Sequence, residues 1–277
     1  MKKWNLIVDV ANCTNCNVCT LAVQDEHVGN DFPGYAAEMP KHGHRWIDIK
    51  RRERGVPPVT DVAYLPTMCQ HCDDAPCIAA APDAVTKRPD GIVVIDPVKS
   101  KGRRELVDAC PYGAIWWNEE LDLPQHWFFD AHLLDAGWTE PRCVTVCATN
   151  ALKAVKIEDS EMARLAASEG LEPLRPDLAT GARVHYKNLW RYDAVFVAGT
   201  VAFDNDGRTE CLEGAEVSLL KDGKVIATQK TDIFGDFKFD RLKADNEAYE
   251  IEVTTKSASK RASVTLETSK TVGEIRV

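Results

Sequence analysis

Cysteine spacing constrains the fold of this chain more than any other feature of its sequence. Ten cysteines occur among 277 residues. The segment ANCTNCNVCTLAVQDEH, residues 11–27, places Cys13, Cys16 and Cys19 in a C-x2-C-x2-C pattern. The full run C-x2-C-x2-C-x3-C is typical of loops that hold [4Fe–4S] clusters, but its fourth position here is Val23. The first run is therefore either incomplete or completed by a cysteine from elsewhere in the chain.

Three more cysteine motifs follow, and each departs from the full run. The second motif, CQHCDDAPCIAAAP, ends with Ala81 in the fourth position after three cysteines: Cys69, Cys72 and Cys77. The third motif keeps Cys110, followed by Pro111, and has other residues at its three earlier positions: Ser100, Arg103 and Leu106. The fourth motif keeps Cys143 and Cys147 and has other residues where an upstream pair belongs: Trp127 and Asp130.

A crossing rule assigns the remaining cysteines to two complete sites. In proteins with two such clusters, the last cysteine of one run ligates the other cluster. The rule gives a first cluster four thiolates: Cys13, Cys16, Cys19 and Cys147. It gives a second cluster another four: Cys69, Cys72, Cys77 and Cys110. The same rule would build two further sites, one from Val23, Trp127, Asp130 and Cys143 and the other from Ala81, Ser100, Arg103 and Leu106. Cysteines are missing from these two sets together, which supports the pairing and indicates that two further clusters are absent.

The replacements at the lost positions are expected to fill space. Removing a cluster leaves a hole, and an unfilled cavity is costly. Trp127, Leu106 and Arg103 are large enough to occupy such a hole. The alternative is a third cluster in which Asp130 or Ser100 ligates iron through oxygen, although neither has enough thiolate partners.

The other candidate ligands are open to different interpretations. Structural zinc is the alternative for the cysteine loops, but zinc sites usually pair two C-x2-C knuckles, whereas these runs have three cysteines. His71, inside the second loop, is a candidate ligand but is more compatible with a supporting role. Cys143 is expected to be an inert remnant of a lost cluster, and Cys211 is expected to pack in an apolar core.

Charge and hydropathy narrow the class of protein. The net charge of −9 argues against a nucleic-acid-binding protein. The N-terminal segment MKKWNLIVDVANC is neither a signal peptide nor a membrane span. Ten cysteines in a reducing compartment favour metal ligation over disulfides. The sequence therefore predicts a soluble, cytoplasmic metalloprotein.

Periodicity divides the chain into three parts, at residues 1–157, 158–194 and 195–277. The first part contains short strands and cysteine loops, including a strand at WNLIVDV and a hairpin at AVTKRPDGIVVID. The second contains a helix over 159–170 and an extended connector over 182–193. The third alternates apolar and polar residues between turn signals, which predicts an all-β sandwich of seven strands.

The motifs resemble a known family. Four crossed runs, the CPYGAI segment and the AHLLDAGWTEPRC stretch are similar to the iron–sulfur subunits of the molybdopterin oxidoreductase (dimethyl sulfoxide reductase) family. The resemblance covers residues 1 to about 157. It implies an α+β fold with two ferredoxin-like halves that carry [4Fe–4S] clusters and relay electrons to or from a large molybdenum subunit.

The C-terminal part narrows the resemblance. Missing cysteines, the connector RVHYKNLWR and a transthyretin-like (Ig-like) sandwich resemble the small subunits of the pyrogallol–phloroglucinol transhydroxylase and resorcinol hydroxylase group. The resemblance implies that a partner subunit holds molybdenum on two pterin guanine dinucleotides and transfers or adds hydroxyl groups on di- or trihydroxybenzenes. The absent cysteines, at position 23 and in the fourth motif, put any relay through the lost cluster in doubt.

Three roles remain open for the chain, and none includes a catalytic residue of its own. The first is an electron-transfer subunit of a transhydroxylase-like enzyme. The second is a relay, either as a resorcinol-type hydroxylase subunit that passes electrons to a soluble acceptor or as the relay of an unrelated molybdenum enzyme, such as a sulfur or nitrogen oxide reductase. The third is a scaffold whose clusters are structural, for which four tryptophans would suit an interface: Trp46, Trp116, Trp117 and Trp190.

Overall fold

The computed structural model describes residues 1–255 and 258–277, and these form two compact units. The first unit comprises Met1–Arg51 and Tyr64–Leu189, and the second comprises Arg52–Ala63 and Trp190–Val277. The second unit therefore contains a short stretch from the N-terminal half, which the expected division into three consecutive parts does not include.

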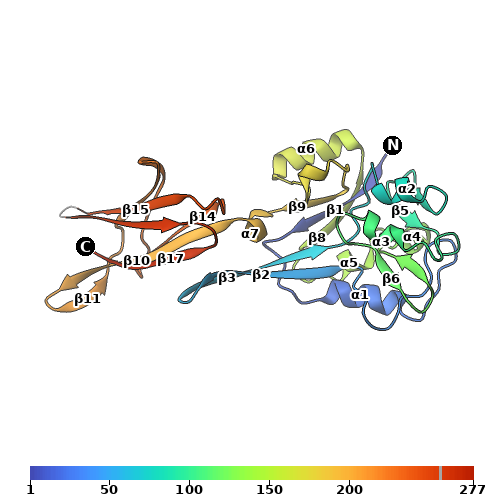
Figure 1. Ribbon diagram of the computed structural model, residues 1–277, viewed down its shortest axis with the longest axis horizontal. Helices are drawn as coiled ribbons and strands as arrows, with labels where there is room; N and C mark the ends of the chain where they lie inside the picture. The colour runs from blue at the N-terminus through green and yellow to red at the C-terminus, as the bar shows by residue number, and fades with distance from the viewer. Residues whose placement is uncertain (256–257) are drawn as a thin grey trace. The chain divides into compact units, whose positions relative to one another are not determined.

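The first unit contains a three-stranded sheet (Figure 1). Its middle strand β1 (Lys3–Asp9) pairs antiparallel with β8 (Leu152–Ile157) and parallel with β9 (Val184–Lys187). Five consecutive residues of β1 are buried, as expected for a central strand covered on both faces. The predicted strand at WNLIVDV is thus confirmed, but the predicted connector is not wholly extended, because it contributes β9 and then the helix α7 (Trp190–Asp193).

Short helices and hairpins carry the cysteine loops of the first unit. The helices are α1 (Val18–His27), α2 (Pro76–Ala80), α3 (Glu105–Ala109), α4 (Ala131–Asp135), α5 (Arg142–Thr145), α6 (Asp159–Glu169) and the 3-10 helix η1 (Pro176–Leu178). Two strand pairs belong to this unit, β4 (Val85–Lys87) with β5 (Val93–Ile95) and β6 (Trp116–Asn118) with β7 (Leu123–Gln125). A third pair, β2 (Asp48–Val56) with β3 (Val59–Thr67), is divided between the two units. Among the residues described, no helix is long and apolar enough to cross a membrane.

Two local predictions in this unit are confirmed. The hairpin expected at AVTKRPDGIVVID is β4 paired antiparallel with β5. The helix expected over 159–170 is α6, and Gly170 ends it in the left-handed conformation at a φ of 64°. Glycine adopts this conformation without the penalty that a Cβ imposes.

The second unit contains two four-stranded sheets around one apolar core. One sheet has the order β11-β10-β14, and β17 also pairs with β10, in parallel. The other has the order β13-β12-β15-β16. The strands are β10 (Val195–Asn205), β11 (Arg208–Cys211), β12 (Glu216–Lys221), β13 (Lys224–Lys230), β14 (Asp236–Leu242), β15 (Ala248–Thr254), β16 (Ser259–Thr265) and β17 (Lys270–Arg276). Alternate residues of these strands, such as Val217 and Leu219 of β12, point into the shared core.

Eight strands occur among residues 195–255 and 258–277, so the prediction of seven was wrong. The additional strand is β11, whose four residues are all exposed. It has no buried face, and therefore no apolar alternation that the sequence could reveal. Cys211, at the end of β11, is exposed as well, which corrects the expectation that it packs in the core.

Arg54 is buried inside the second unit, at the tip of the β2–β3 hairpin. Only 2% of its surface is exposed. Its guanidinium donates to the carboxylate of Asp240 over 3.0 Å and to that of Asp61, and it lies 5.5 Å from the ring centre of Phe196. The next residue is Gly55, where a Cβ would lie 2.6 Å from the Phe196 ring, so only glycine fits. The tip is therefore held by ion pairs and close packing.

Candidate iron–sulfur sites

The second set of cysteines lines one enclosed cavity in the first unit. Three of the thiols come from the loop after β3 and from α2, and the fourth follows α3: Cys69, Cys72, Cys77 and Cys110. Most of the remaining wall is apolar, with Val93, Ile95 and Ile115 among its residues. His126 also lines the cavity, and its Nε2–H donates to the carbonyl of Val93 over 3.0 Å. The structure thus brings together all four residues that the crossing rule assigned to the second cluster.

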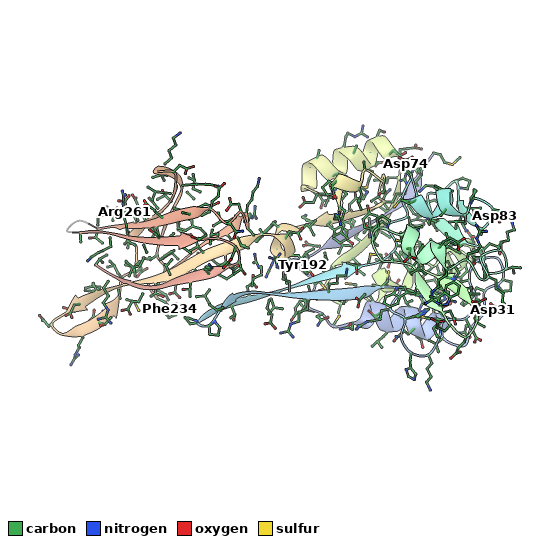
Figure 2. The ribbon with its side chains drawn as sticks, viewed as in Figure 1. Asp31, Asp74, Asp83, Tyr192, Phe234 and Arg261 are labelled. Atoms are coloured by element: carbon green, nitrogen blue, oxygen red, sulfur yellow. The ribbon has the colours of Figure 1, made fainter. Side chains whose placement is uncertain are left out.

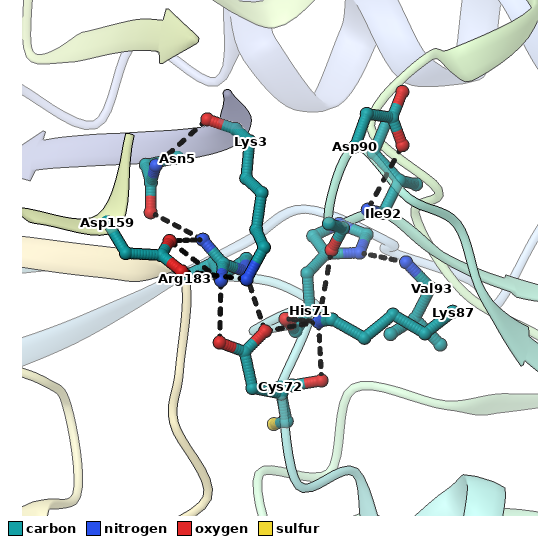
Figure 3. Close-up of polar contacts among 12 residues, drawn as sticks. Lys3, Asn5, His71, Cys72, Lys87, Asp90, Ile92, Val93, Asp159 and Arg183 are labelled. Carbon is teal, nitrogen blue, oxygen red and sulfur yellow. Dashed lines mark hydrogen bonds and ion pairs between the residues drawn. The ribbon is translucent and has the colours of Figure 1, made fainter. Parts of the chain in front are cut away.

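Lys87 anchors the second cysteine loop from the neighbouring hairpin (Figure 3). Its ammonium donates to the carbonyls of His71 and Cys72 over 2.9 and 2.7 Å, and it pairs with Asp73 over 2.8 Å. Arg183 holds the same Asp73 carboxylate with two further hydrogen bonds, of 2.7 and 2.6 Å. Positive charge is therefore fixed against the backbone of the loop.

His71 supports this loop through its ring. The Nδ1 atom accepts a hydrogen bond from the backbone N–H of Val93 over 3.1 Å. The ring is buried, and burial lowers the pKa of His71 well below its usual value, so the imidazole is neutral at pH 7. These contacts agree with the supporting role expected for His71 rather than with a ligand role.

The first set of cysteines gathers where α1 meets α5. Cys13 and Cys16 lie in the loop after β1, Cys19 lies in the first turn of α1, and Cys147 follows α5. Burial, followed by the charges of Cys13 and Cys147, raises the pKa of the Cys19 thiol to about 11. The pKa of Cys13 is raised by burial and by Cys16 and Cys147. Cys13 therefore interacts with each of the other three thiols predicted for the first cluster.

The chemistry of these donors fits a polynuclear cluster. Burial, followed by the charges of neighbouring thiolates, also raises the pKa of Cys77 to about 11. Several thiolates crowded in a poorly solvated site need a cationic centre to offset their charge. Across residues 1–255 and 258–277, no three His, Cys, Asp or Glu side chains are grouped so as to hold one metal ion. Each iron of a cubane takes one protein thiolate, so a cubane does not require such a group.

The first set of lost positions is filled and buried. Val23, Trp127, Asp130 and Cys143 are each at most 1% exposed. The indole of Trp127 donates to Asp130, and the other carboxylate oxygen of Asp130 accepts from the backbone N–H of Arg142 over 2.8 Å. Burial raises the pKa of Cys143 well above its usual value, and the charge of Asp130 adds to the shift. One protonated thiol and an engaged carboxylate remain where a cluster would need four ligands.

His27 is a buried polar residue at this place that the sequence analysis missed. It is fully buried at the end of α1, and its Nε2 lies 3.7 Å from Oδ1 of Asp130. Its ring packs edge-on against Phe128 with 5.1 Å between ring centres. A lone histidine at the end of a helix carries no sequence signal for such a position.

The second set of lost positions is also buried, except for Arg103, which was expected to fill space there. Ala81, Ser100 and Leu106 are completely buried. Arg103 instead lies at the surface, where it pairs with Glu105 over 2.6 Å and with Asp83, which is labelled in Figure 2, over 3.2 Å. The expectation that Arg103 fills the hole was therefore wrong, because two carboxylates hold its guanidinium outside.

The four tryptophans expected at an interface differ in exposure. Trp46 is only 1% exposed and packs with its ring centre 4.9 Å from that of His27, so it cannot present a face to a partner. Trp116, Trp117 and Trp190 are partly buried. The expectation of exposed aromatic side chains is thus wrong for Trp46.

Comparison with known proteins defines the class. A family model described as a 4Fe-4S dicluster domain matches residues 60–157. One of the subunits of tetrathionate reductase from Salmonella typhimurium is 32% identical over 193 residues, which cover 68% of this chain and 73% of that protein. The thiosulfate reductase electron transfer subunit PhsB of Salmonella typhi is 29% identical over 163 residues, covering 58% and 80%. The protein is an iron–sulfur electron-transfer subunit related to those of molybdenum oxidoreductases, whose catalytic site lies on the partner subunit.

A more similar relative defines the group within this class. The pyrogallol hydroxytransferase small subunit of Pelobacter acidigallici is 44% identical over 256 residues, which cover 91% of each chain. The chain therefore belongs to the pyrogallol hydroxytransferase small-subunit family. Among solved structures, Klebsiella pneumoniae 5-hydroxyisourate hydrolase covers 30% of this chain and 84% of its own, at 14% identity and a TM-score of 0.26, too low to support an argument.

Proposed function

We propose that the chain carries two [4Fe–4S] clusters, each held by one of the two crossed sets of thiols. The ligands of the first are Cys13, Cys16, Cys19 and Cys147, and those of the second are Cys69, Cys72, Cys77 and Cys110. The convergence of the second set on a single enclosed cavity is the observation that carries this proposal. The buried Trp127 and Leu106 at the lost positions support a total of two clusters rather than three or four.

The proposed partner is a large subunit that holds molybdenum on two pterin guanine dinucleotides and acts on di- or trihydroxybenzenes. The similarity to the pyrogallol hydroxytransferase small subunit, which spans both units of this chain, supports the substrate class. The chain itself supplies the thiolate ligands, surroundings that exclude water and a positive charge at Lys87. Together these tune the reduction potential of a cluster. Cytoplasmic location remains part of the proposal.

Two reactions of the partner make different demands on the clusters. Transfer of a hydroxyl group between two aromatic rings needs no net electrons. Addition of a hydroxyl group from water releases two electrons and two protons, and the electrons must leave through the clusters to an acceptor. The loss of two of four cluster sites favours the first reaction, because no long chain of cofactors is needed. The second stays the alternative, with a soluble acceptor.

The C-terminal sheets are proposed to form a transthyretin-like sandwich. It serves as a packing module or a module that docks another protein, and it binds no cofactor. Its two four-stranded sheets and shared apolar core support this assignment. No additional redox role is assigned to it.

Iron and acid-labile sulfide should be counted in the complex purified without oxygen. About eight of each per small subunit are expected for two cubanes. About twelve would contradict the two-cluster proposal, and zinc without sulfide would overturn the electron-transfer role. Freeze-quenched electron paramagnetic resonance during turnover then separates a relay from a scaffold, because only a relay shows clusters that are reduced and reoxidised within one catalytic cycle.

A further inference from the structure

A segment that follows η1, residues 179–183, is bound to the second cysteine loop. It lies beyond the part of the chain matched by the family model, which ends at residue 157. The backbone N–H of Asp73 donates to the carbonyl of Gly181 over 2.9 Å. The next N–H, of Asp74, donates to the carbonyl of Thr180 over 3.0 Å. A Cβ at Gly181, whose φ is 61°, would lie 3.0 Å from the Cβ of Asp73. The segment is therefore a close and fixed neighbour of this loop.

The hydroxyl of Thr180 contacts both a tyrosine and a proposed ligand of the second cluster. Only 6% of the surface of Thr180 is exposed. Its Oγ1 lies 2.7 Å from the hydroxyl oxygen of Tyr112, and Tyr112 lines the same cavity as Cys72. Burial raises the pKa of the Cys72 thiol, and a side-chain hydrogen bond with Thr180 is the largest effect that lowers it. Thr180 thus connects the phenol of Tyr112 to the sulfur of Cys72.

The number of available protons determines the direction of these two hydrogen bonds. A threonine hydroxyl has one proton to donate and an oxygen that can accept. A thiolate that ligates iron has no proton, so Cys72 can only accept in the occupied site. The proton of Thr180 is then used on sulfur, and its oxygen must accept from Tyr112. Burial raises the pKa of Tyr112, and the charges of Cys72 and Cys110 add to the shift, so the phenol keeps its proton at neutral pH.

A second donor reaches the same set of thiols from the segment that contains Tyr112. The backbone N–H of Ala114 donates to Sγ of Cys110 over 3.4 Å. Hydrogen bonds to sulfur stabilise the additional negative charge of a reduced cluster and so raise its reduction potential. In a poorly solvated site a hydrogen bond is electrostatically stronger than in water. The loss of one donor to Cys72 or Cys110 should therefore have a measurable effect on the potential.

We propose that Thr180 donates a hydrogen bond to the thiolate of Cys72 and thereby raises the reduction potential of the second cluster, with Tyr112 as a positioning residue. Tyr112 acts through Thr180, because its O–H donates to the threonine oxygen and leaves the threonine proton for sulfur. The reduction adds one electron and changes no covalent bond. The inference rests on the proposed function and deepens it, since it names residues that set the potential of one cluster. The alternative is a structural clamp, in which the two hydroxyls join residues 179–183 to the site without affecting the potential.

The test measures the reduction potentials of both clusters in the complex with the large subunit, by electron paramagnetic resonance at controlled potentials. Thr180→Val removes the hydroxyl and keeps the branched shape of the side chain. It should lower the equilibrium constant for reduction of the second cluster about tenfold, which is about 59 mV for one electron, and leave the first cluster unchanged. Tyr112→Phe should cause a smaller fall, and Thr180→Ser should restore the potential.

Thr149→Val is the matched control for the loss of a threonine hydroxyl near a cluster. Oγ1 of Thr149 lies 3.9 Å from Sγ of Cys147, which belongs to the first set of thiols. The substitution should therefore leave the potential of the second cluster unchanged.

An unchanged potential of the second cluster in Thr180→Val, with about eight irons retained, would overturn the inference and leave the structural clamp. An equal fall in the potentials of both clusters would overturn it too, because the effect would then be general. So would a fall that Thr180→Ser does not reverse, which indicates altered packing rather than a lost hydrogen bond.

Tyr112→Phe decides the question if Thr180→Val does not retain the second cluster, because it leaves Thr180 in place. A lower potential in Tyr112→Phe supports the chain of hydroxyls, and an unchanged potential overturns it. A complex with unaltered sequence that shows no second reducible cluster would instead contradict the proposed function itself.

Discussion

The indole N–H of Trp127 donates to a carboxylate oxygen of Asp130 over 3.1 Å, and both side chains are buried where the fourth cysteine motif lacks a C-x2-C pair. The two replacements thus satisfy each other's polar groups. Asp130 uses its second oxygen on the backbone N–H of Arg142. These positions, which the sequence predicts to have lost a cluster, are thus a packed core with internal hydrogen bonds.

Trp127→Ala should lower the free energy of unfolding by about 3–5 kcal/mol. The substitution opens a large cavity and leaves a carboxylate oxygen of buried Asp130 without its indole donor. Denaturant unfolding under anaerobic conditions measures the change. Trp138→Ala, at a tryptophan that is 46% exposed, is the control and should cost much less. Equal losses for the two variants would show that Trp127 has no special packing role.

Cys110→Ser and Cys147→Ser should each remove one cluster and leave the other in place. Each variant is expected to retain about four irons per chain instead of about eight, because the two sites share no ligand. Iron analysis and electron paramagnetic resonance of the reduced protein identify which signal is lost.

Cys211→Ser and Cys143→Ser are the controls for this assignment. Cys211 is exposed on β11, and Cys143 is a buried thiol outside both proposed ligand sets. Both variants should keep about eight irons. Loss of iron in Cys143→Ser would mean that the fourth motif still holds a cluster.

Lys87→Met should lower the reduction potential of the second cluster by roughly 50 mV, the size expected for one charge at about 10–15 Å in an effective dielectric of about 20. The ammonium donates to the carbonyl of Cys72 and stabilises the additional negative charge of the reduced state. A redox titration monitored by electron paramagnetic resonance measures the reduction potentials of both clusters. Lys101→Met, at an exposed lysine, is the control; an upward shift in Lys87→Met would contradict the argument.

His126 should contribute about 1.4 kcal/mol to the loss of stability between pH 7.5 and 5.5. Burial lowers the pKa of this residue to about 4, whereas the unfolded chain binds the proton near pH 6.5. The stabilising contribution is complete above pH 6.5 and is lost as the pH falls toward 4. His126→Gln, which can still donate to Val93, should reduce the difference in stability between pH 7.5 and 5.5 by about 1.4 kcal/mol, and His42→Gln should not. An unchanged slope in His126→Gln would refute the assignment.

Much of the fold was predictable because the signals are local. Alternation of apolar and polar residues identified the strands of the second unit, and Asp90-Gly91 identified the β4–β5 hairpin. The strand β11 could not be found in this way, since all four of its residues are exposed. The tip of the β2–β3 hairpin could not be assigned to the second unit either, because its partners, Asp240 and Phe196, lie more than 130 residues away along the chain.

The candidate site was predictable to the extent that cysteine spacing determines it. The crossing rule brought together the same thiols that the structure brings together, including Cys110 with the loop of Cys69. Spacing gives no information on side chains that are not ligands. Arg103 was assigned to the interior by its size, but its exposed carboxylate partners decide its position. His27 was missed because its burial depends on tertiary packing alone.

The buried Arg54 has a consequence for how this chain can be divided. The backbone passes between the two units three times, at residues 51–52, 63–64 and 189–190, so the second unit is discontinuous in sequence. A fragment that begins at residue 190 would lack the guanidinium that pairs with Asp240. A fragment that ends there would instead expose the hairpin tip with its arginine unpaired by Asp240. The C-terminal sheets therefore cannot be exchanged between proteins by joining genes at one boundary without losing the Arg54–Asp240 ion pair.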